Sequence, residues 1–242
     1  MKKYELTAEC KTLDNGTKLF RIKALRDFSN VKAGDLGGWV EKEGNLSQEG
    51  DAWIYDYAIV CEKARVFGNA RVSGDAMIFG DAMVFGNAVV SEKVRVFGDA
   101  WVFGNATVFK KAKVYGNANV QGYARIFGDA MVFGDAWISG DANIHGEAMV
   151  FGIAWISGDA VISGNAEVCL NNHYAAIKGF GTNFRKTTFF RCKDEKIRVN
   201  WGFFHGTIDE FRERVKNTRE GKIAKEYLMI ADLMEYHFNS EE

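Results

Sequence analysis

Proline is absent from all 242 residues of the chain, and cysteine occurs only four times. A chain without proline keeps every backbone amide available as a hydrogen-bond donor, which suits extended and paired strands. Cys10, Cys61, Cys169 and Cys192 lie far apart in the sequence. Neither a disulfide framework nor a metal site with closely spaced ligands is expected, and no cofactor is predicted.

Long apolar runs and an excess of charge are missing as well. No stretch reaches the roughly 18 apolar residues of a membrane-spanning helix, and the first residues do not form a hydrophobic signal region. The 31 basic residues are balanced by 32 acidic ones, so the overall charge favours neither nucleic acid nor an anionic membrane as a partner. The sequence predicts a cytoplasmic protein that binds neither.

A six-residue repeat runs through the middle of the chain. Val or Ile occupies each of the twenty positions at intervals of six from Ile54 to Val168. Alanine follows four residues later at eighteen of nineteen positions, with Val94 as the exception. Glycine fills fifteen of the nineteen positions two residues after the aliphatic one, and Asp or Asn usually comes next. Weaker repeats extend back to Leu36 and Val40.

This period predicts short strands joined by tight corners. Six is a multiple of the two-residue period of a strand and does not match the 3.6-residue period of a helix. The aliphatic residue and the alanine then point to the same side, and glycine supplies the positive φ of the corner. Three strands close one triangular coil, and coils stack about 4.8 Å apart. We expect a mainly β, parallel β-helix of about seven coils and about 35 Å.

The repeat units carry a specific resemblance. Units such as Val-Phe-Gly-Asn-Ala-Arg at residues 66–71 resemble the repeat of hexapeptide-repeat proteins, and this resemblance implies a left-handed parallel β-helix. The entry segment, from Leu25 through Gly34 and Gly37–Val40 to Gln48, and the tail from Thr188 to Phe211 resemble uncharacterised bacterial and phage or prophage proteins of this type. The resemblance covers nearly the whole chain. It implies the fold, with an α+β module after the repeats, and leaves the function open.

Both ends of the solenoid have segments that can cover an open coil, which would otherwise expose unpaired strand edges. Residues 4–25 alternate as two strands around a turn at residues 14–17. Residues 187–193 and 196–201 predict a second hairpin. Thr207 and Glu210 form a capping box that opens the first of two helices, and the second helix runs from Lys222 to Phe238. We expect an N-terminal β-hairpin cap over 1–35, the β-helix over 36–170 and a C-terminal α+β cap over 171–242.

The outward positions of the coils predict three faces of different character. Two adjacent faces are aromatic and apolar, whereas the third is polar and carries Arg71, Ser73 and Asn143. Aromatic columns can simply stack along the solenoid. However, a face of about 400 Å² is at the size that monomers usually hide. We therefore expect a homo-oligomer, most simply a trimer with parallel axes. Its predicted interface residues are Phe79, Phe97, Tyr115, Phe133, Phe151, Met131, Met149, Trp101, Trp137 and Trp155.

Acyl transfer is the activity of the best-known hexapeptide-repeat proteins, in which a histidine acts as general base and a loop from one coil encloses coenzyme A. No insertion interrupts the register from residue 54 to residue 168, so no such loop is expected. The one histidine of the coils, His145, is predicted to be an exposed surface residue. His173, His205 and His237 lie in the C-terminal segment, where packing roles are expected. No catalytic residue is predicted.

A basic stretch in the C-terminal segment carries the functional prediction. Seven cations lie between Lys178 and Arg198 and are interleaved with phenylalanines. They either balance the acidic solenoid or bind a phosphate-bearing ligand by charge-assisted hydrogen bonds and ring stacking. The candidate ligand-binding residues are Arg185, Lys186, Thr187, Arg191, Trp201 and His205. We predict a non-enzymatic, oligomeric binding protein of phage or prophage type that sequesters a nucleotide-derived small molecule. A structural or polymer-forming scaffold is the first alternative, and an acyltransferase is the second.

Overall fold

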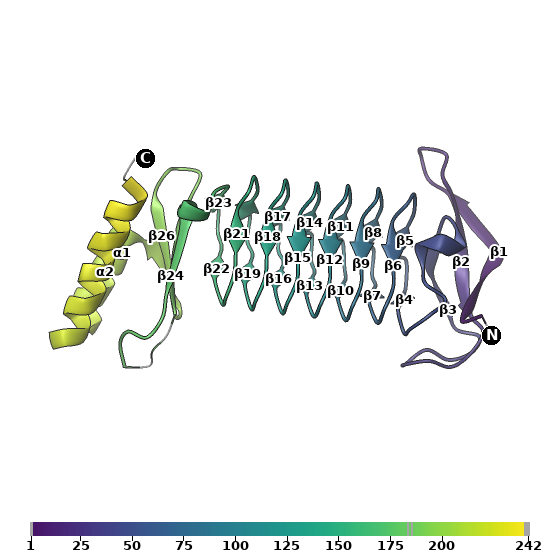
Figure 1. Ribbon diagram of the computed structural model, residues 1–242, viewed down its shortest axis with the longest axis horizontal. Helices are drawn as coiled ribbons and strands as arrows, with labels where there is room; N and C mark the ends of the chain where they lie inside the picture. Colours follow the sequence, from purple (N-terminus) through teal and green to yellow (C-terminus); the bar gives the residue numbers. More distant parts are fainter. Residues whose placement is uncertain (1, 183, 185, 240–242) are drawn as a thin grey trace.

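A straight stack of parallel coils forms the middle of the molecule, with a different cap at each end (Figure 1). The computed structural model describes residues 2–182, 184 and 186–239. The N-terminal hairpin lies at one end of the stack, and a four-stranded sheet covered by two helices lies at the other. The two termini are therefore at opposite ends of the long axis.

The N-terminal cap is a hairpin that continues into the solenoid. Strands β1 (Tyr4–Thr12) and β2 (Lys18–Ala24) pair antiparallel, as the alternation predicts. Strand β2 also pairs antiparallel with β3 (Leu36–Val40), and β3 begins the parallel stack. A short 3-10 helix, η1 (Glu43–Asn45), follows β3. The buried rings of Tyr4, Phe28 and Trp53 close this end of the core.

Three parallel sheets form the walls of the solenoid. The first continues from β3 through β5 (Ile59–Val60), β8 (Met77–Ile78), β11 (Arg95–Val96), β14 (Lys113–Val114), β17 (Met131–Val132), β20 (Met149–Val150) and β23 (Glu167–Val168). The second contains β4 (Trp53–Ile54), β7 (Arg71–Val72), β10 (Val89–Val90), β13 (Thr107–Val108), β16 (Arg125–Ile126), β19 (Asn143–Ile144) and β22 (Val161–Ile162). The third contains β6 (Arg65–Val66), β9 (Met83–Val84), β12 (Trp101–Val102), β15 (Asn119–Val120), β18 (Trp137–Ile138) and β21 (Trp155–Ile156).

The register of the coils confirms the predicted repeat. Residues eighteen apart are hydrogen-bonded neighbours, as in the pairing of Val90 with Val108. The inward aliphatic and alanine positions are fully buried along the whole stack. The first coil is longer, because Val40 pairs with Val60 and Leu46 bridges to Val66, a separation of twenty residues in each case.

The corners have the conformation that glycine favours. The repeat glycines have φ values between +61° and +78°, as expected for a left-handed corner. Where glycine is missing, the replacement residue has the same conformation: Asp56, Glu62, Glu92 and Lys110 have φ values of 56°, 59°, 64° and 64°. The corner geometry therefore belongs to the repeat position and does not depend on glycine alone.

Aromatic side chains form ladders on the outside of the walls. On the first sheet, successive rings from Phe79 to Phe151 stack with centroids 4.8–5.0 Å apart and nearly parallel planes. On the third sheet Phe67, Phe85 and Phe103 stack in the same way. Stacking leaves the rings half-buried, whereas the neighbouring tryptophans are more exposed, up to 57 % for Trp155.

The C-terminal cap begins with the 3-10 helix η2 (Asn171–His173) and an antiparallel sheet. Its strands are β24 (Tyr174–Ile177), β25 (Thr187–Arg191), β26 (Ile197–Trp201) and β27 (Phe204–Thr207). Helices α1 (Ile208–Thr218) and α2 (Gly221–Asn239) cover its outer face (Figure 1). The predicted capping box is confirmed, since Thr207 and Glu210 exchange hydrogen bonds. Among the described residues no helix is long and apolar enough to cross a membrane.

Candidate functional site

The two faces of the cap sheet contact different parts of the molecule. Neighbouring residues of a strand point to opposite faces. On β25, Phe190 belongs to the core of the solenoid, whereas Phe189 packs with the helices. On β26, Asn200 hydrogen-bonds to the last coil, whereas Trp201 packs against Phe211 of α1. The sheet therefore has a solenoid side and a helix side, with a separate pocket on each.

The predicted ligand-binding residues are divided between these two sides. Lys186 and His205 face the solenoid, where Lys186 lies 3.6 Å from Asp159. Trp201 faces the helices, and Thr187 is completely buried, with a hydroxyl that has no hydrogen-bond partner among the described residues. The sixth candidate, Arg185, lies outside the described residues.

Arg191 has a structural contact within the C-terminal cap. Its guanidinium donates a hydrogen bond to the backbone carbonyl of Phe238, near the end of α2. The five described candidates thus do not converge on one cavity, because alternate side chains of a strand diverge. The sequence stretch is continuous, but the surface that it forms is not.

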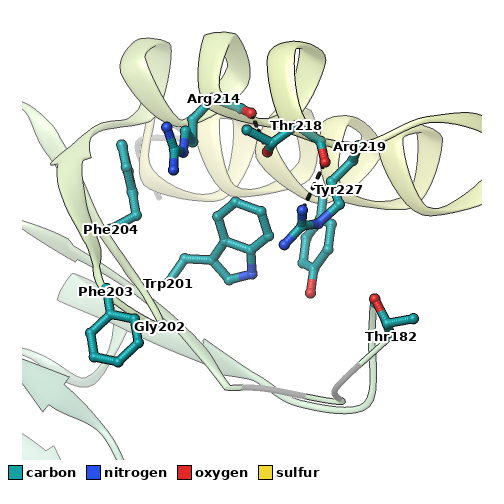
Figure 2. A pocket seen from close by; sticks show the side chains of 10 residues that line it. Thr182, Trp201, Gly202, Phe203, Phe204, Arg214, Thr218, Arg219 and Tyr227 are labelled. Atoms are coloured by element: carbon teal, nitrogen blue, oxygen red, sulfur yellow. Dashed lines mark hydrogen bonds between the residues drawn. The ribbon is translucent and has the colours of Figure 1, made fainter.

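The pocket on the helix side lies between the end of α1, the start of α2 and the β26–β27 turn (Figure 2). It has a volume of about 200 Å³. We call it the helix-side pocket; it is lined by Gly181, Thr182, Trp201, Gly202, Phe203, Phe204, Arg214, Thr218, Arg219 and Tyr227.

Aromatic packing makes the floor of this pocket rigid. The Trp201 ring is only 8 % exposed and packs against Phe211 and Tyr227, with ring centroids 5.3 and 4.9 Å away. The Tyr227 hydroxyl donates to the carbonyl of Phe180 at 2.9 Å and so ties the 180–182 loop to α2. A Cβ at Gly181 would lie 2.5 Å from that hydroxyl oxygen, so this close approach requires glycine.

Two arginines give the helix-side pocket a positive charge. The Arg219 guanidinium lies over the Trp201 ring, 5.0 Å from its centroid, and donates to the Thr218 carbonyl at 2.7 Å. Arg214 comes from the preceding turn of α1. Among the described residues no carboxylate lines the pocket, and neither arginine has an ion pair. Both guanidinium groups are therefore available to an anion.

Arg212, on the same helix, shows the opposite arrangement. Its guanidinium is within 3.3 Å of the carboxylates of Asp209, Asp232 and Glu235. Burial alone would lower the pKa of Arg212, but the hydrogen bonds to Glu235 and Asp232 outweigh it and raise the pKa above its ordinary value. The three arginines of α1 and its C-terminal end thus divide into one structural residue and two with open guanidinium groups.

The second pocket lies between the cap sheet and the last coils. It has a volume of about 740 Å³, and its polar residues include His145, Lys186 and His205. We call it the solenoid-side pocket. Burial lowers the pKa of His145, and the charges of His205 and Lys110 lower it further. Burial also lowers the pKa of Lys186, while the carboxylate of Asp159 raises it in part.

A hydrogen-bond network fixes His205 in this pocket. The side-chain amide nitrogen of Asn200 donates to the Val161 carbonyl at 2.8 Å and to Ser163 Oγ at 3.1 Å. This orients the amide oxygen of Asn200 toward His205 Nδ1, 2.5 Å away. Because an amide oxygen only accepts, Nδ1 carries the proton and Nε2 of the neutral ring is left as an acceptor. In its uncharged form the ring thus presents Nε2 as a proton acceptor, as a general base does.

His145 differs from the sequence-based expectation. It was expected to be exposed, but it is half-buried. Its ring stacks on Phe127 with centroids 4.9 Å apart and faces the same pocket as His205. The C-terminal cap lies over this part of the polar face and buries it in part. A repeat pattern does not show which coil positions a distant segment will cover. For the same reason the sequence did not indicate Arg214 and Arg219, which meet Trp201 only after the helices fold back on the sheet.

Comparisons with known proteins support the solenoid. The YdcK Beta solenoid repeat family matches residues 64–78, 76–92 and 124–140. Over 63 residues the chain is 44 % identical to the uncharacterized acetyltransferase YdcK of Escherichia coli (strain K12). This match covers 23 % of the chain and 19 % of that relative, so the two proteins are compared over only about a fifth of the relative's length. The segments that the repeat family matches lie in the coils and include none of the residues that line the two C-terminal pockets.

Proposed function

We propose that the chain is a small-molecule-binding β-solenoid whose helix-side pocket captures the phosphate-bearing end of a nucleotide-derived ligand. The observation that supports this proposal is the pair of open guanidinium groups of Arg214 and Arg219 beside Trp201, without a carboxylate in the lining. Arginine binds phosphate with charge-assisted and often bidentate hydrogen bonds. Packing of Arg219 on the indole orients one guanidinium before the ligand arrives.

The size of the pocket limits what it holds. At about 200 Å³ it is smaller than the roughly 300–1,000 Å³ of pockets that enclose whole drug-sized ligands. The phosphate end fits inside, and the rest of the ligand extends outward past the exposed ring of Phe203 on the β26–β27 turn. We propose capture without turnover, in a protein of the phage or prophage type that the resemblance of its two ends implies.

Calorimetry with cyclic and linear nucleotides tests this proposal. Loss of one charge-assisted contact costs about 1.5–3 kcal/mol, so Arg219→Ala is expected to weaken binding by at least about tenfold. Affinity of the parent protein is expected to fall as salt rises, because the contact is ionic. Arg212→Ala is the charge control: it removes the same charge from α1, the helix that ends just before Arg219, but its guanidinium is already paired with carboxylates, so affinity should stay within about twofold.

Two results would contradict the proposal. Equal losses in Arg212→Ala and Arg219→Ala would indicate a general charge effect. No binding by any nucleotide in the panel, with the fold intact by circular dichroism, would leave the structural scaffold as the better interpretation.

Acyl transfer is the second candidate, and the geometry of His205 favours it. The relative in Escherichia coli carries the name acetyltransferase, and His205 has its Nδ1 proton fixed by Asn200 and an acceptor Nε2 in a pocket of about 740 Å³. With Nε2 unprotonated, His205 can take a proton from the hydroxyl or amine of an acceptor while that group attacks a thioester.

His205→Asn separates this candidate from the first. Asparagine can keep a donor near the position of Nδ1 but has no basic nitrogen in place of Nε2. If the site transfers acetyl groups, release of thiol from acetyl-coenzyme A with pooled amine and hydroxyl acceptors should fall by about 10²–10⁴-fold. His145→Asn, in the same pocket, serves as the control. Turnover that is absent in the parent, or equal in all three proteins, would remove acyl transfer as a candidate.

A further inference from the structure

A charged groove runs along the first sheet of the solenoid and shares no lining residue with either pocket. Its volume is about 610 Å³, and it follows the corner that precedes β11, β14, β17, β20 and β23. One half is lined by Lys93, Arg95, Lys111 and Lys113. The other half, toward the C-terminal cap, is lined by Asp129, Glu147 and Glu167, together with Lys193 from the cap itself. A solenoid with an acidic net charge thus concentrates four cations on two adjacent coils.

Few of these charged side chains form ion pairs within the chain. Among the described residues the groove contains one ion pair, Lys111 with Asp129 at 3.9 Å, and its side chains are 68 % and 62 % exposed. Such an exposed pair stabilises a fold very little. The groove borders the aromatic ladder from Phe79 to Phe151, so a basic half, an acidic half and an apolar column lie side by side.

We infer that this face binds a second copy of the chain with its long axis reversed. A two-fold axis that lies in the interface and runs across the sheet places each column of residues against the same column of the other copy, in opposite order. The basic half of each groove then faces the acidic half of the other. This self-complementarity of charge is the reason for inferring that the partner on this face is a second copy of the chain.

The pairing can be followed coil by coil along the corner column, which reads Asp75, Lys93, Lys111, Asp129, Glu147 and Asn165. With the axis between the coils of Lys111 and Asp129, Lys111 of one copy meets Asp129 of the other. Lys93 meets Glu147 in the same way, and symmetry doubles both contacts. Asp75 meets Asn165 and the adjacent Lys193, whose backbone nitrogen bonds to the Asn165 carbonyl. No like charges face one another in this column.

The neighbouring columns are compatible with the same axis. Arg95 and Lys113 face Met149 and Met131, whose flexible side chains accommodate irregular contacts. The ladder places Tyr115 against Phe133 and Phe97 against Phe151, so ring meets ring. In an arrangement with parallel axes, by contrast, the basic coils of one copy lie level with the basic coils of the other. The charge order therefore favours an antiparallel dimer over the parallel trimer expected from the sequence.

The size of the face indicates how stable this pair is. Six coils at about 4.8 Å and a wall about 18 Å wide give roughly 500 Å² per copy, which is below the roughly 800 Å² of a standard interface. Charge pairing must therefore contribute to affinity, and high salt should favour the monomer.

Analytical ultracentrifugation of charge-reversal variants tests the inference. Lys93→Glu with Lys111→Glu makes the four central residues of the corner column acidic, and Asp129→Lys with Glu147→Lys makes these four residues basic. Each double variant should be monomeric at concentrations where the parent is dimeric. The quadruple variant restores opposite charges in the antiparallel pair and should dimerise again, but it should not mix with the parent. Arg71→Glu with Arg125→Glu, on the second sheet, is the control and should leave the dimer intact.

Cysteine cross-linking reports the direction of the axes. With the exposed Cys10 changed to serine, a mixture of Arg95→Cys and Met149→Cys proteins should form a disulfide-linked dimer on oxidation, whereas neither protein alone should. Thermal melting confirms that each variant is folded. A monomeric or trimeric parent, a folded quadruple variant that stays monomeric, or cross-linking of either single-cysteine protein alone would overturn the inference.

Discussion

Val102→Asp is expected to unfold the middle of the solenoid. Val102 is completely buried on β12, inside a core that contains only aliphatic and alanine side chains at this level. A carboxylate here has no partner, and its burial costs several kcal/mol, on the order of 4. Because the coils depend on their neighbours, hydrogen–deuterium exchange should show lost protection in the flanking coils, and the midpoint of chemical denaturation should fall.

Asn105→Asp is the control for Val102→Asp, since it adds the same charge at an exposed corner three residues later. Its side-chain oxygen accepts a hydrogen bond from Asn87, and a carboxylate can do the same. Stability should change by less than about 0.5 kcal/mol. An unchanged denaturation midpoint for Val102→Asp would contradict the inward position of the whole aliphatic column.

Gly140→Ala is expected to destabilise the fold by about 2–4 kcal/mol. Gly140 has a φ of +66°, and an added Cβ would lie 2.7 Å from the carbonyl oxygen and 2.8 Å from the amide nitrogen of Gly158 in the next coil. The left-handed conformation alone costs a non-glycine residue about 1–2 kcal/mol, and the contact with rigid backbone adds to it. Urea denaturation followed by circular dichroism measures the difference.

The reciprocal substitution, Glu92→Gly, should act in the opposite direction. Glu92 occupies the same repeat position with a φ of 64°. Glycine relieves that strain but gains freedom in the unfolded chain, so we expect a net stabilisation of no more than about 1 kcal/mol. If both substitutions shifted stability in the same direction, corner geometry would not explain the glycine pattern.

The repeat could be predicted from the sequence because each hexad encodes its own environment. A buried aliphatic residue, a buried alanine and a left-handed corner recur at fixed spacing, so local pattern and overall fold agree. The N-terminal hairpin and the capping box of α1 are local signals of the same kind. The two extra residues of the first coil were not predicted, because the repeats before Ile54 are too weak to fix the spacing there.

The C-terminal cap could be predicted only in part. Strand β26 alternates clearly and β25 precedes it across the predicted turn, whereas β24 and β27 are four residues each and carry no distinctive pattern. Four of the six candidate binding residues were chosen by composition along the basic stretch, and Trp201 and His205 were added from the segment that follows it. Composition does not show that Lys186 and Trp201 face opposite sides of a sheet, nor that Arg219 reaches Trp201 from another element.

Hydrogen-bonded neighbours in successive coils are eighteen residues apart, so the solenoid can change in length while its two caps stay the same. Gain or loss of one full coil during evolution returns the chain to the same corner, with the same wall facing the next element. The solenoid-side pocket depends on the last coils and the cap, and the helix-side pocket depends on the cap alone. Lineages can therefore lengthen or shorten the rod, and re-order the charges along it, without altering the chemistry at its tip.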